Sequence, residues 1–184
     1  MKKAFRLAAL FAILALYFAV APFGYGAFAL LSLVPTRDRV RRARLLQGIM
    51  RRHFTLLHDL MRWSALLDFN ARHIEGELPE GPVVLVANHP GLLDVTALMA
   101  ALSDVTTAVK PILYRRRWWR PLLDGARLFP GAADPLDTAH VVDAGCERLQ
   151  EGFRVLIFPE GTRSPQAGLH RFGRTAFEIA CRAN

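Results

Sequence analysis

Cysteine is scarce in this chain: only Cys146 and Cys181 occur among its 184 residues. Two cysteines this far apart form neither a disulfide framework nor the C-x-x-C spacing of a metal site. We therefore interpret both as small apolar helix residues, and we expect no metal and no redox cofactor. Internal repeats and low-complexity linkers are absent as well, so a single compact domain is expected at this length.

Charge is missing from the N-terminal region, where no Asp, Glu, Lys or Arg occurs between Arg6 and Arg37. The apolar run from Leu7 to Val34 is longer than the ~20 residues that a membrane-spanning helix needs. Basic residues flank the run on both sides, and such residues tend to stay on the cytoplasmic side of a membrane. The sequence therefore predicts a membrane anchor in residues 1–35, with the rest of the chain on the cytoplasmic face of the inner membrane.

The form of this anchor is open. The segment Pro22 to Gly26 interrupts the run with one proline and two glycines, which weaken a helix. This favours a re-entrant helical hairpin with both ends cytoplasmic, and a single tilted, kinked span is the alternative. A cleaved signal peptide is a third possibility, because the basic start and the tripeptide Ala19 to Ala21 resemble one.

Residues 36–70 have the pattern of a basic amphipathic helix for which Thr36 offers an N-cap. Apolar residues recur on one face at helical spacing, namely Val40, Leu45, Leu46, Ile49, Met50, Phe54, Leu57, Leu60 and Met61. The opposite positions are mostly arginine. This pattern fits a helix at a membrane interface, and it fits equally a helix whose apolar face packs on a protein core.

Residues 71–184 have the pattern of an α/β domain, since short β-branched runs alternate with helical segments. Strands are expected at Val83–Ala87, Val105–Val109 and Val155–Phe158. Helices are expected at Asp94–Leu102, Thr138–Glu151 (ended by Gly152) and Arg171–Arg182, whereas Leu122–Phe129 is ambiguous.

A histidine and an aspartate follow the first of these strands. The segment from Ala87 to Asp94 leaves the strand and enters a helix, which is where open α/β sheets bind ligands. A Pro-Gly turn after His89 allows Asp94 to lie near the imidazole. A carboxylate that accepts the Nδ1 hydrogen leaves Nε2 able to take a proton from a hydroxyl. We interpret the pair as a catalytic base and its orienting partner; an aspartate that only caps the helix beside a structural histidine is the alternative.

The segment Phe158 to Ser164 follows another strand, so it is expected at the same edge as the histidine if the strands are parallel. Gly161 permits close backbone approach, Thr162 supplies a hydroxyl, and Arg163 can clamp a phosphate through paired hydrogen bonds. Glu160 can accept from an acceptor hydroxyl or hold the arginine in place. A turn with a local Glu-Arg pair is the alternative for this segment alone.

Together the two segments resemble the lysophospholipid acyltransferase family, which includes the 1-acylglycerol-3-phosphate acyltransferases. The family pairs Asn-His-x-x-x-x-Asp with a downstream Phe-Pro-Glu-Gly-Thr-Arg-Ser, and both motifs are intact here, in residues 88–94 and 158–164. The resemblance covers residues 70–184. It implies a mixed, partly parallel sheet flanked by helices.

The resemblance also implies an activity and a site. The family consists of membrane-bound O-acyltransferases of phospholipid biosynthesis, which move a fatty acyl group from acyl-CoA or acyl carrier protein to the hydroxyl of a lysolipid. No cofactor is implied beyond that acyl donor, and the other partners are membrane lipids and the lysolipid. His89 and Asp94 would be the catalytic residues. The substrate-binding residues would be Asn88, Lys110, Arg127, Glu160, Gly161, Thr162 and Arg163.

Two departures from the family pattern concern the acceptor and the C-terminus. A family Gly is followed six residues later by an Arg that helps to hold the acceptor phosphate, but here Gly125 is followed by Gly131. Arg127 or the cluster Arg115–Arg117 would replace that Arg; otherwise the acceptor is a lyso-ornithine lipid or another lipid without glycerol phosphate. The chain also ends before the family's fourth, Val-Pro-rich block, so we expect a C-terminally incomplete domain that is poorly stable or inactive.

The basic charge balance leaves other functions open. Lys and Arg outnumber Asp and Glu by 24 to 16, which gives a formal net charge of +8 and favours an anionic partner. The segment Tyr114 to Arg120 alternates cations with aromatic rings, as in a nucleic-acid-binding module, and a noncatalytic membrane scaffold is a further alternative. Beside an apolar anchor the same residues fit an interfacial belt better, so we expect a membrane and no nucleic acid as the partner.

Overall fold

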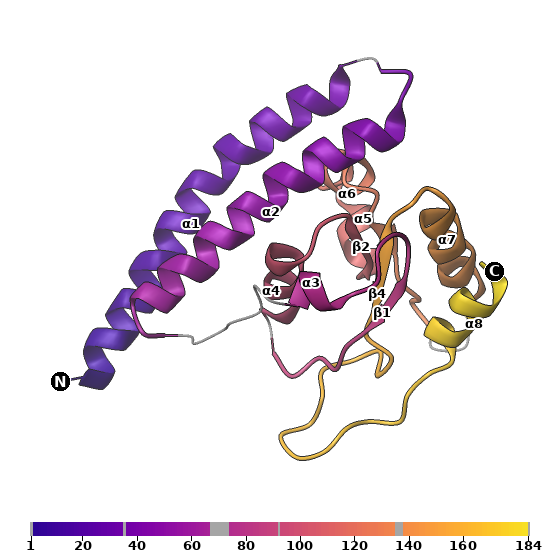
Figure 1. The fold of residues 1–184 in the computed structure, drawn as a ribbon. Coiled ribbons are helices and arrows are strands. Elements are labelled where there is room, and N and C mark those ends of the chain that lie inside the picture. The colour runs from indigo at the N-terminus through magenta and orange to yellow at the C-terminus, as the bar shows by residue number, and fades with distance from the viewer. Residues whose placement is uncertain (1, 35, 67–73, 92, 135–137, 184) are drawn as a thin grey trace.

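Two long N-terminal helices lie beside a smaller α/β unit with a parallel sheet (Figure 1). The computed structural model describes residues 2–34, 36–66, 74–91, 93–134 and 138–183. The expected boundary at residues 70–71 lies outside the described residues. The helices are α1 (Lys2–Leu33), α2 (Arg39–Trp63), α3 (Ile74–Glu77), α4 (Asp94–Ala101), α5 (Pro111–Arg115), α6 (Arg120–Gly125), α7 (Ala139–Gln150) and α8 (Thr175–Arg182). The strands are β1 (Val84–Val86), β2 (Val105–Val109), β3 (Phe129–Pro130) and β4 (Arg154–Ile157).

Helix α1 is continuous through Pro22 to Gly26, so the predicted re-entrant hairpin is wrong. It packs along α2, where the rings of Tyr17 and His53 lie 4.6 Å apart, and Phe28 is buried in the core on the far side of the interruption. Contacts on both sides of the proline offset its cost within a helix, which is about 3 kcal/mol. Among the described residues no helix is both long enough and apolar enough to cross a bilayer, so the predicted spanning anchor is not confirmed.

The N-cap of α2 is Asp38 rather than the expected Thr36, because the Asp38 carboxylate accepts a hydrogen bond from the Arg41 N–H at 2.8 Å. One face of α2 packs on α4, α1 and α6. The residues buried on α2 are Ala43, Leu46, Gln47, Met50, Leu57, His58 and Met61. The core-packing interpretation is therefore confirmed for this face, although Leu45 and Leu56 are more than half exposed.

The four described strands form a sheet in the order β1-β4-β2-β3. Every pairing among them is parallel, so the mixed sheet that was expected is not found in the described part of the chain. Helices follow β1 and β2, and α7 precedes β4, so the chain returns each time to the same end of the sheet. The parallel arrangement gathers the carboxyl ends of the strands at one edge.

Both faces of this sheet are covered, as the central strand β4 illustrates. Leu156 is buried in the core formed with α2, α4 and α6, whereas Val155 and Ile157 are buried against α7 and α8. This is the alternation expected of a strand with helices on both sides. Helices α7 and α8 approach very closely at Gly145, where a Cβ atom would lie 2.5 Å from the Cδ1 of Ile179.

The predicted elements of the α/β part are confirmed in kind. Strand β2 matches its prediction, and β1, β4, α4 and α7 agree to within one residue at each end. Gly152, with φ of +86°, ends α7 as expected, and Cys146 and Cys181 carry free thiols in α7 and α8. Helix α8 begins at Thr175 rather than at Arg171, because the preceding residues belong to a loop. The ambiguous segment contains the end of α6 and the start of β3, and the short helices α3 and α5 were not predicted.

Candidate active site

The segments that follow β1 and β4 leave the sheet side by side. Val86 pairs with Ile157, and the N–H of Ala87 continues the ladder by donating to the carbonyl of Ile157 at 3.3 Å. The rings of His89 and Phe158 then pack 4.6 Å apart. The two motifs therefore share one edge of the sheet, as their positions after parallel strands predicted.

His89 and Asp94 are in direct contact. The Nδ1 atom of His89 lies 2.8 Å from Oδ2 of Asp94, and the same oxygen accepts from the N–H of Gly91 at 2.6 Å. Because a carboxylate only accepts, Nδ1 carries a hydrogen and Nε2 of the neutral ring has a lone pair. No described residue forms a hydrogen bond with Nε2, and both side chains are about one fifth exposed (22% and 23%). The dyad is therefore oriented and accessible to a small hydroxyl group.

Ser164 links the main chain of His89 to the second motif. The N–H of His89 donates to Oγ of Ser164 at 3.1 Å, and the N–H of Ser164 donates to the carbonyl of His89 at 2.9 Å. The Ser164 hydroxyl in turn donates to the carboxylate of Glu160. This hydroxyl is thus directed away from the imidazole and does not form a Ser-His nucleophile pair. The sequence placed Ser164 within the motif but suggested no role for it.

Glu160 is buried at the base of this loop, with 9% of its surface exposed. Its carboxylate accepts from the Ser164 hydroxyl and from the N–H of His170 at 2.8 Å. These bonds, first of all the one from Ser164, hold the pKa of Glu160 below its ordinary value. No ion pair joins Glu160 to Arg163 among the described residues. The carboxylate therefore organises the loop, and the alternative of a local Glu-Arg pair is not found among the described residues.

The other residues of the two motifs are available to a ligand. Asn88, Thr162 and Arg163 are exposed, and Gly161 has a φ of +66°, which a residue with a Cβ atom rarely adopts. Lys110 is exposed directly after β2, which neighbours β4, so it belongs to the same edge of the sheet. These residues, which we call the rim, therefore belong to the same edge of the sheet as the dyad.

The structure does not bring Arg127 to this edge. Its guanidinium forms ion pairs with Glu147, at 3.1 Å, and with Glu151, and its carbonyl accepts from the hydroxyl of Thr106 near the start of β2. Arg127 thus lies at the opposite end of the sheet and links that end to α7. Gly131 is at the active edge instead, where its N–H donates to the carbonyl of Val109 at 2.7 Å.

The aromatic residues of the segment Tyr114 to Arg120 contact other parts of the protein, although Trp118 is 53% exposed. Trp118 and Trp119 stack 4.7 Å apart, and Trp118 also meets the ring of Tyr25 in α1 edge-on at 6.3 Å. The Tyr114 hydroxyl donates to the carbonyl of Leu128, and burial raises its pKa. The neighbouring cluster Arg115–Arg117 is exposed. The rings therefore attach this basic segment to α1.

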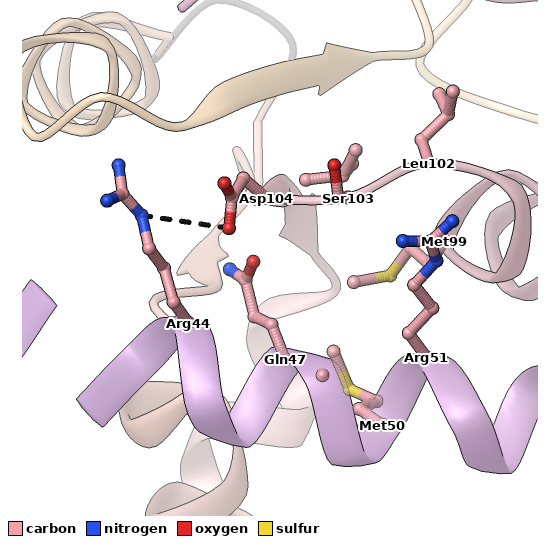
Figure 2. A pocket seen from close by; sticks show the side chains of 10 residues that line it. Arg44, Gln47, Met50, Arg51, Met99, Leu102, Ser103 and Asp104 are labelled. Carbon is pink, nitrogen blue, oxygen red and sulfur yellow. Dashed lines mark ion pairs between the residues drawn. The ribbon is translucent and has the colours of Figure 1, made fainter. Parts of the chain in front are cut away.

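A cavity of about 80 Å³ lies between α2 and the connection from α4 to β2 (Figure 2). Figure 2 shows Arg44 and Arg51 of α2 beside this cavity. Arg44 forms an ion pair with Asp104, in which Nε and Oδ1 lie 3.7 Å apart. Asp104 precedes the first residue of β2, so the cavity is at the opposite edge of the sheet from His89. None of the residues in the two motifs lines it.

Comparison with known proteins points to one family. Residues 70–184 match the family model described as Acyltransferase. The chain is 32% identical over 111 residues to a 1-acyl-sn-glycerol-3-phosphate acyltransferase of Chlamydomonas reinhardtii, covering 57% of this chain and 32% of that protein. It is also 32% identical over 117 residues to lyso-ornithine lipid O-acyltransferase of Pseudomonas aeruginosa, covering 61% and 43%. The chain thus spans well under half the length of these relatives.

A solved structure has the same fold. The crystal structure of the 1-acyl-sn-glycerophosphate acyltransferase of Thermotoga maritima aligns with all of this chain and with 72% of its own, with a TM-score of 0.70 at 21% identity. The alignment includes the two N-terminal helices as well as the α/β unit.

Proposed function

The chain belongs to the acyltransferase family, and we propose that it transfers a fatty acyl group from a thioester to the hydroxyl of a lysolipid. The observation that carries this proposal is the 2.8 Å contact of His89 Nδ1 with Asp94 Oδ2. No described residue forms a hydrogen bond with Nε2 of the same ring. Acyl-CoA or acyl carrier protein would supply the thioester. The acylated lipid would enter phospholipid biosynthesis.

The dyad would act on the acceptor hydroxyl. Nε2 of His89 takes the hydroxyl proton as the oxygen attacks the thioester carbonyl, and Asp94 stabilises the imidazolium that forms. The tetrahedral intermediate then collapses: the C–S bond breaks, an ester remains, and the imidazolium returns its proton to the departing thiolate. The Ser164 hydroxyl is already bonded to Glu160, which supports direct transfer over a covalent acyl-enzyme.

The exposed cations at the rim would hold an anionic acceptor. Arg163 offers a planar pair of donors and Lys110 a point charge, both of which bind phosphate well. Asn88, Gly161 and Thr162 would add neutral donors beside them. Glu160 would not contact the acceptor. Its hydrogen bonds with Ser164 and His170 would instead hold the loop that carries Gly161, Thr162 and Arg163.

Two lipids are candidates for the acceptor. A 1-acylglycerol-3-phosphate is the first. A lyso-ornithine lipid is the second, because Gly131 stands where the family has a phosphate-binding Arg and the structure does not bring Arg127 to the site. The similarity to the Pseudomonas aeruginosa enzyme supports this second candidate.

A lipid acceptor implies contact with a membrane, and we propose that the two N-terminal helices provide part of it, on the cytoplasmic face of the inner membrane. Large apolar side chains that are more than half exposed support this: Phe5, Leu7, Phe11, Leu16 and Leu30 on α1, and Leu45, Leu56 and Trp63 on α2. Arginines of α2 lie among them and suit lipid phosphates.

The proposal is tested by acyl transfer from labelled acyl-CoA and acyl carrier protein to lysophosphatidate and to lyso-ornithine lipid. His89→Ala is expected to lose 10²-fold or more in rate, as general-base catalysis contributes about 10² to 10⁴. Lys110→Ala should raise KM for the phosphate acceptor and leave kcat less changed. Transfer that is unaffected by His89→Ala would refute the assignment.

A further inference from the structure

The segment 161–174, which connects the second motif to α8, has an unusual composition. It contains Arg163, Arg171 and Arg174, and it has no Asp or Glu. Two large apolar side chains, Leu169 and Phe172, are 56% and 43% exposed within it. Exposed apolar residues next to arginines, without any carboxylate, are typical of surfaces that meet the head groups and acyl chains of anionic lipids.

This segment projects from the catalytic edge. It leaves β4 beside His89, whose main chain forms one hydrogen bond with the Ser164 hydroxyl and one with the Ser164 N–H. In Figure 1 it extends as a long yellow-orange loop beyond the carboxyl ends of the strands, on the side of the molecule where α1 begins and α2 ends. Leu169 and Phe172 therefore belong to a segment that begins at the edge of the sheet that carries the dyad.

Hydrogen bonds hold the apolar residues in their exposed positions. The N–H of His170, between Leu169 and Arg171, donates to the buried carboxylate of Glu160. The N–H of Gly173, directly after Phe172, donates to the carbonyl of Pro159 at 2.7 Å. The segment is therefore fastened at His170 and Gly173, each of which directly follows one of the two apolar residues, and their exposure is a property of the fold.

We propose that segment 161–174 is a membrane-contact loop, which binds an anionic bilayer and thereby positions His89 at its surface. Leu169 and Phe172 enter the interface, and Arg171 and Arg174 pair with lipid phosphates. An acidic carrier protein would also complement the arginines, but the two exposed apolar side chains favour a lipid surface. The inference rests on the proposed function, since a lysolipid acceptor resides in such a surface.

The test is vesicle binding by the purified protein carrying Leu169→Ser and Phe172→Ser together. The vesicles contain phosphatidylcholine and phosphatidylglycerol in equal amounts. Phe177→Ser is the matched control, because Phe177 on α8 is 67% exposed but lies outside the loop. Replacement of the two apolar side chains that enter the lipid interface should weaken the affinity for vesicles about tenfold or more. The control should bind vesicles like the unchanged protein.

Activity provides the second measurement. The double variant should transfer acyl groups poorly to a lysolipid embedded in vesicles, yet normally to a short-chain lysolipid that is monomeric in solution. Unchanged vesicle affinity, an equal loss with both acceptors, or a loss confined to the acyl-carrier-protein donor would overturn the proposal. If the unchanged protein transfers no acyl group at all, the proposed function fails, while vesicle binding still decides whether this loop contacts lipid.

Discussion

The main chain of His89 is joined to Ser164 by two hydrogen bonds, one in each direction, of 3.1 and 2.9 Å. The residues are 75 positions apart in sequence, and they attach the loop after β1 to the loop after β4. Because Ser164 also donates to the buried Glu160, the backbone of His89 is linked through Ser164 to a carboxylate that the fold holds in place.

Removal of the Ser164 hydroxyl should therefore disturb catalysis without removing a reacting group. Ser164→Ala leaves the N–H of His89 without its acceptor and Glu160 with one donor fewer. Loss of hydrogen bonds to a partly buried group costs about 1–3 kcal/mol, so we expect kcat to fall about tenfold, with a smaller change in KM. Ser164→Thr retains the hydroxyl and should restore most of kcat. Equal activity of the alanine and threonine variants would contradict this role.

The contact between Asp94 and His89 predicts a different response. Asp94→Asn preserves the size of the side chain but can donate to Nδ1 and thereby place the hydrogen on Nε2, the wrong tautomer for a base. We expect kcat/KM to fall by about 10² to 10⁴, with unfolding by urea little changed. Retention of near-normal kcat/KM in this variant would show that Asp94 only caps α4.

The carboxylate of Glu75 should make the free energy of unfolding depend on pH. Its carboxylate contacts Arg51 at 2.8 Å and Arg154 at 3.2 Å, and accepts from the N–H of Ser103 at 3.0 Å. Partial burial raises its pKa, but the hydrogen bonds from Ser103 and the two arginines outweigh this, so the pKa lies below its ordinary value. An unfolded glutamate titrates near about 4.3, so the stabilisation is complete above about pH 5 and is lost as the pH falls below about 4.

Urea unfolding at several pH values checks this expectation. Glu75→Gln should be less stable than the unchanged protein at neutral pH, and the difference should shrink as the pH falls below about 4. Glu80→Gln, at an exposed position nearby, is the control and should parallel the unchanged protein. A difference between Glu75→Gln and the unchanged protein that is constant with pH would argue against an ionised Glu75 as the source.

Two glycines in helices should respond to alanine in opposite ways. A Cβ atom on Gly48, within α2, meets nothing within 4 Å, so Gly48→Ala should raise the free energy of unfolding by about 0.5–1 kcal/mol. On Gly145 it would lie 2.5 Å from the Cδ1 of Ile179, and overpacking of this kind costs about 1–3 kcal/mol. Denaturant unfolding of both variants measures whether each substitution raises or lowers the free energy of unfolding. A stabilised Gly145→Ala would mean that α7 and α8 separate easily.

Much of the α/β part was predictable from sequence because strands β2 and β4 are largely buried and helices α7 and α8 are amphipathic. Val105–Val109 was identified to the residue, since a β-branched run between polar residues has no helical alternative. The start of α8 was misplaced because Arg171, Phe172 and Arg174 are compatible with a helix, although Gly173 among them is a weak helix former. The bond from Gly173 to Pro159, made through the backbone, holds them in the loop instead. No local pattern reports such a contact.

The N-terminal region and the acceptor side were predicted less well, for a related reason. Pro22 and the nearby glycines weaken an isolated helix, but packing against α2 keeps α1 continuous, and tertiary packing is not visible in the pattern of one segment. Arg127 stands close in sequence to the expected phosphate-binding position, yet Glu147 and Glu151 hold it at the opposite end of the sheet. The dyad was recognisable because its two residues belong to one turn.

Gly131 offers a way to change the acceptor. It lies at the active edge beside the end of β2, and its φ is not positive, so the backbone accepts a side chain there. A Cβ atom would be 3.3 Å from the carbonyl oxygen of Val109, a close but tolerable contact. Gly131→Met introduces the same crowding without charge and is therefore the matched control.

Gly131→Arg should add a guanidinium near Lys110 and favour a phosphate acceptor. A charge-assisted hydrogen bond contributes about 1.5–3 kcal/mol, so KM for lysophosphatidate should fall about tenfold relative to Gly131→Met, whereas KM for lyso-ornithine lipid should not fall. The gain should diminish at high salt, because exposed charges are screened. If both variants bind lysophosphatidate equally, the acceptor phosphate does not approach position 131, and the departure from the family pattern there has no bearing on substrate choice.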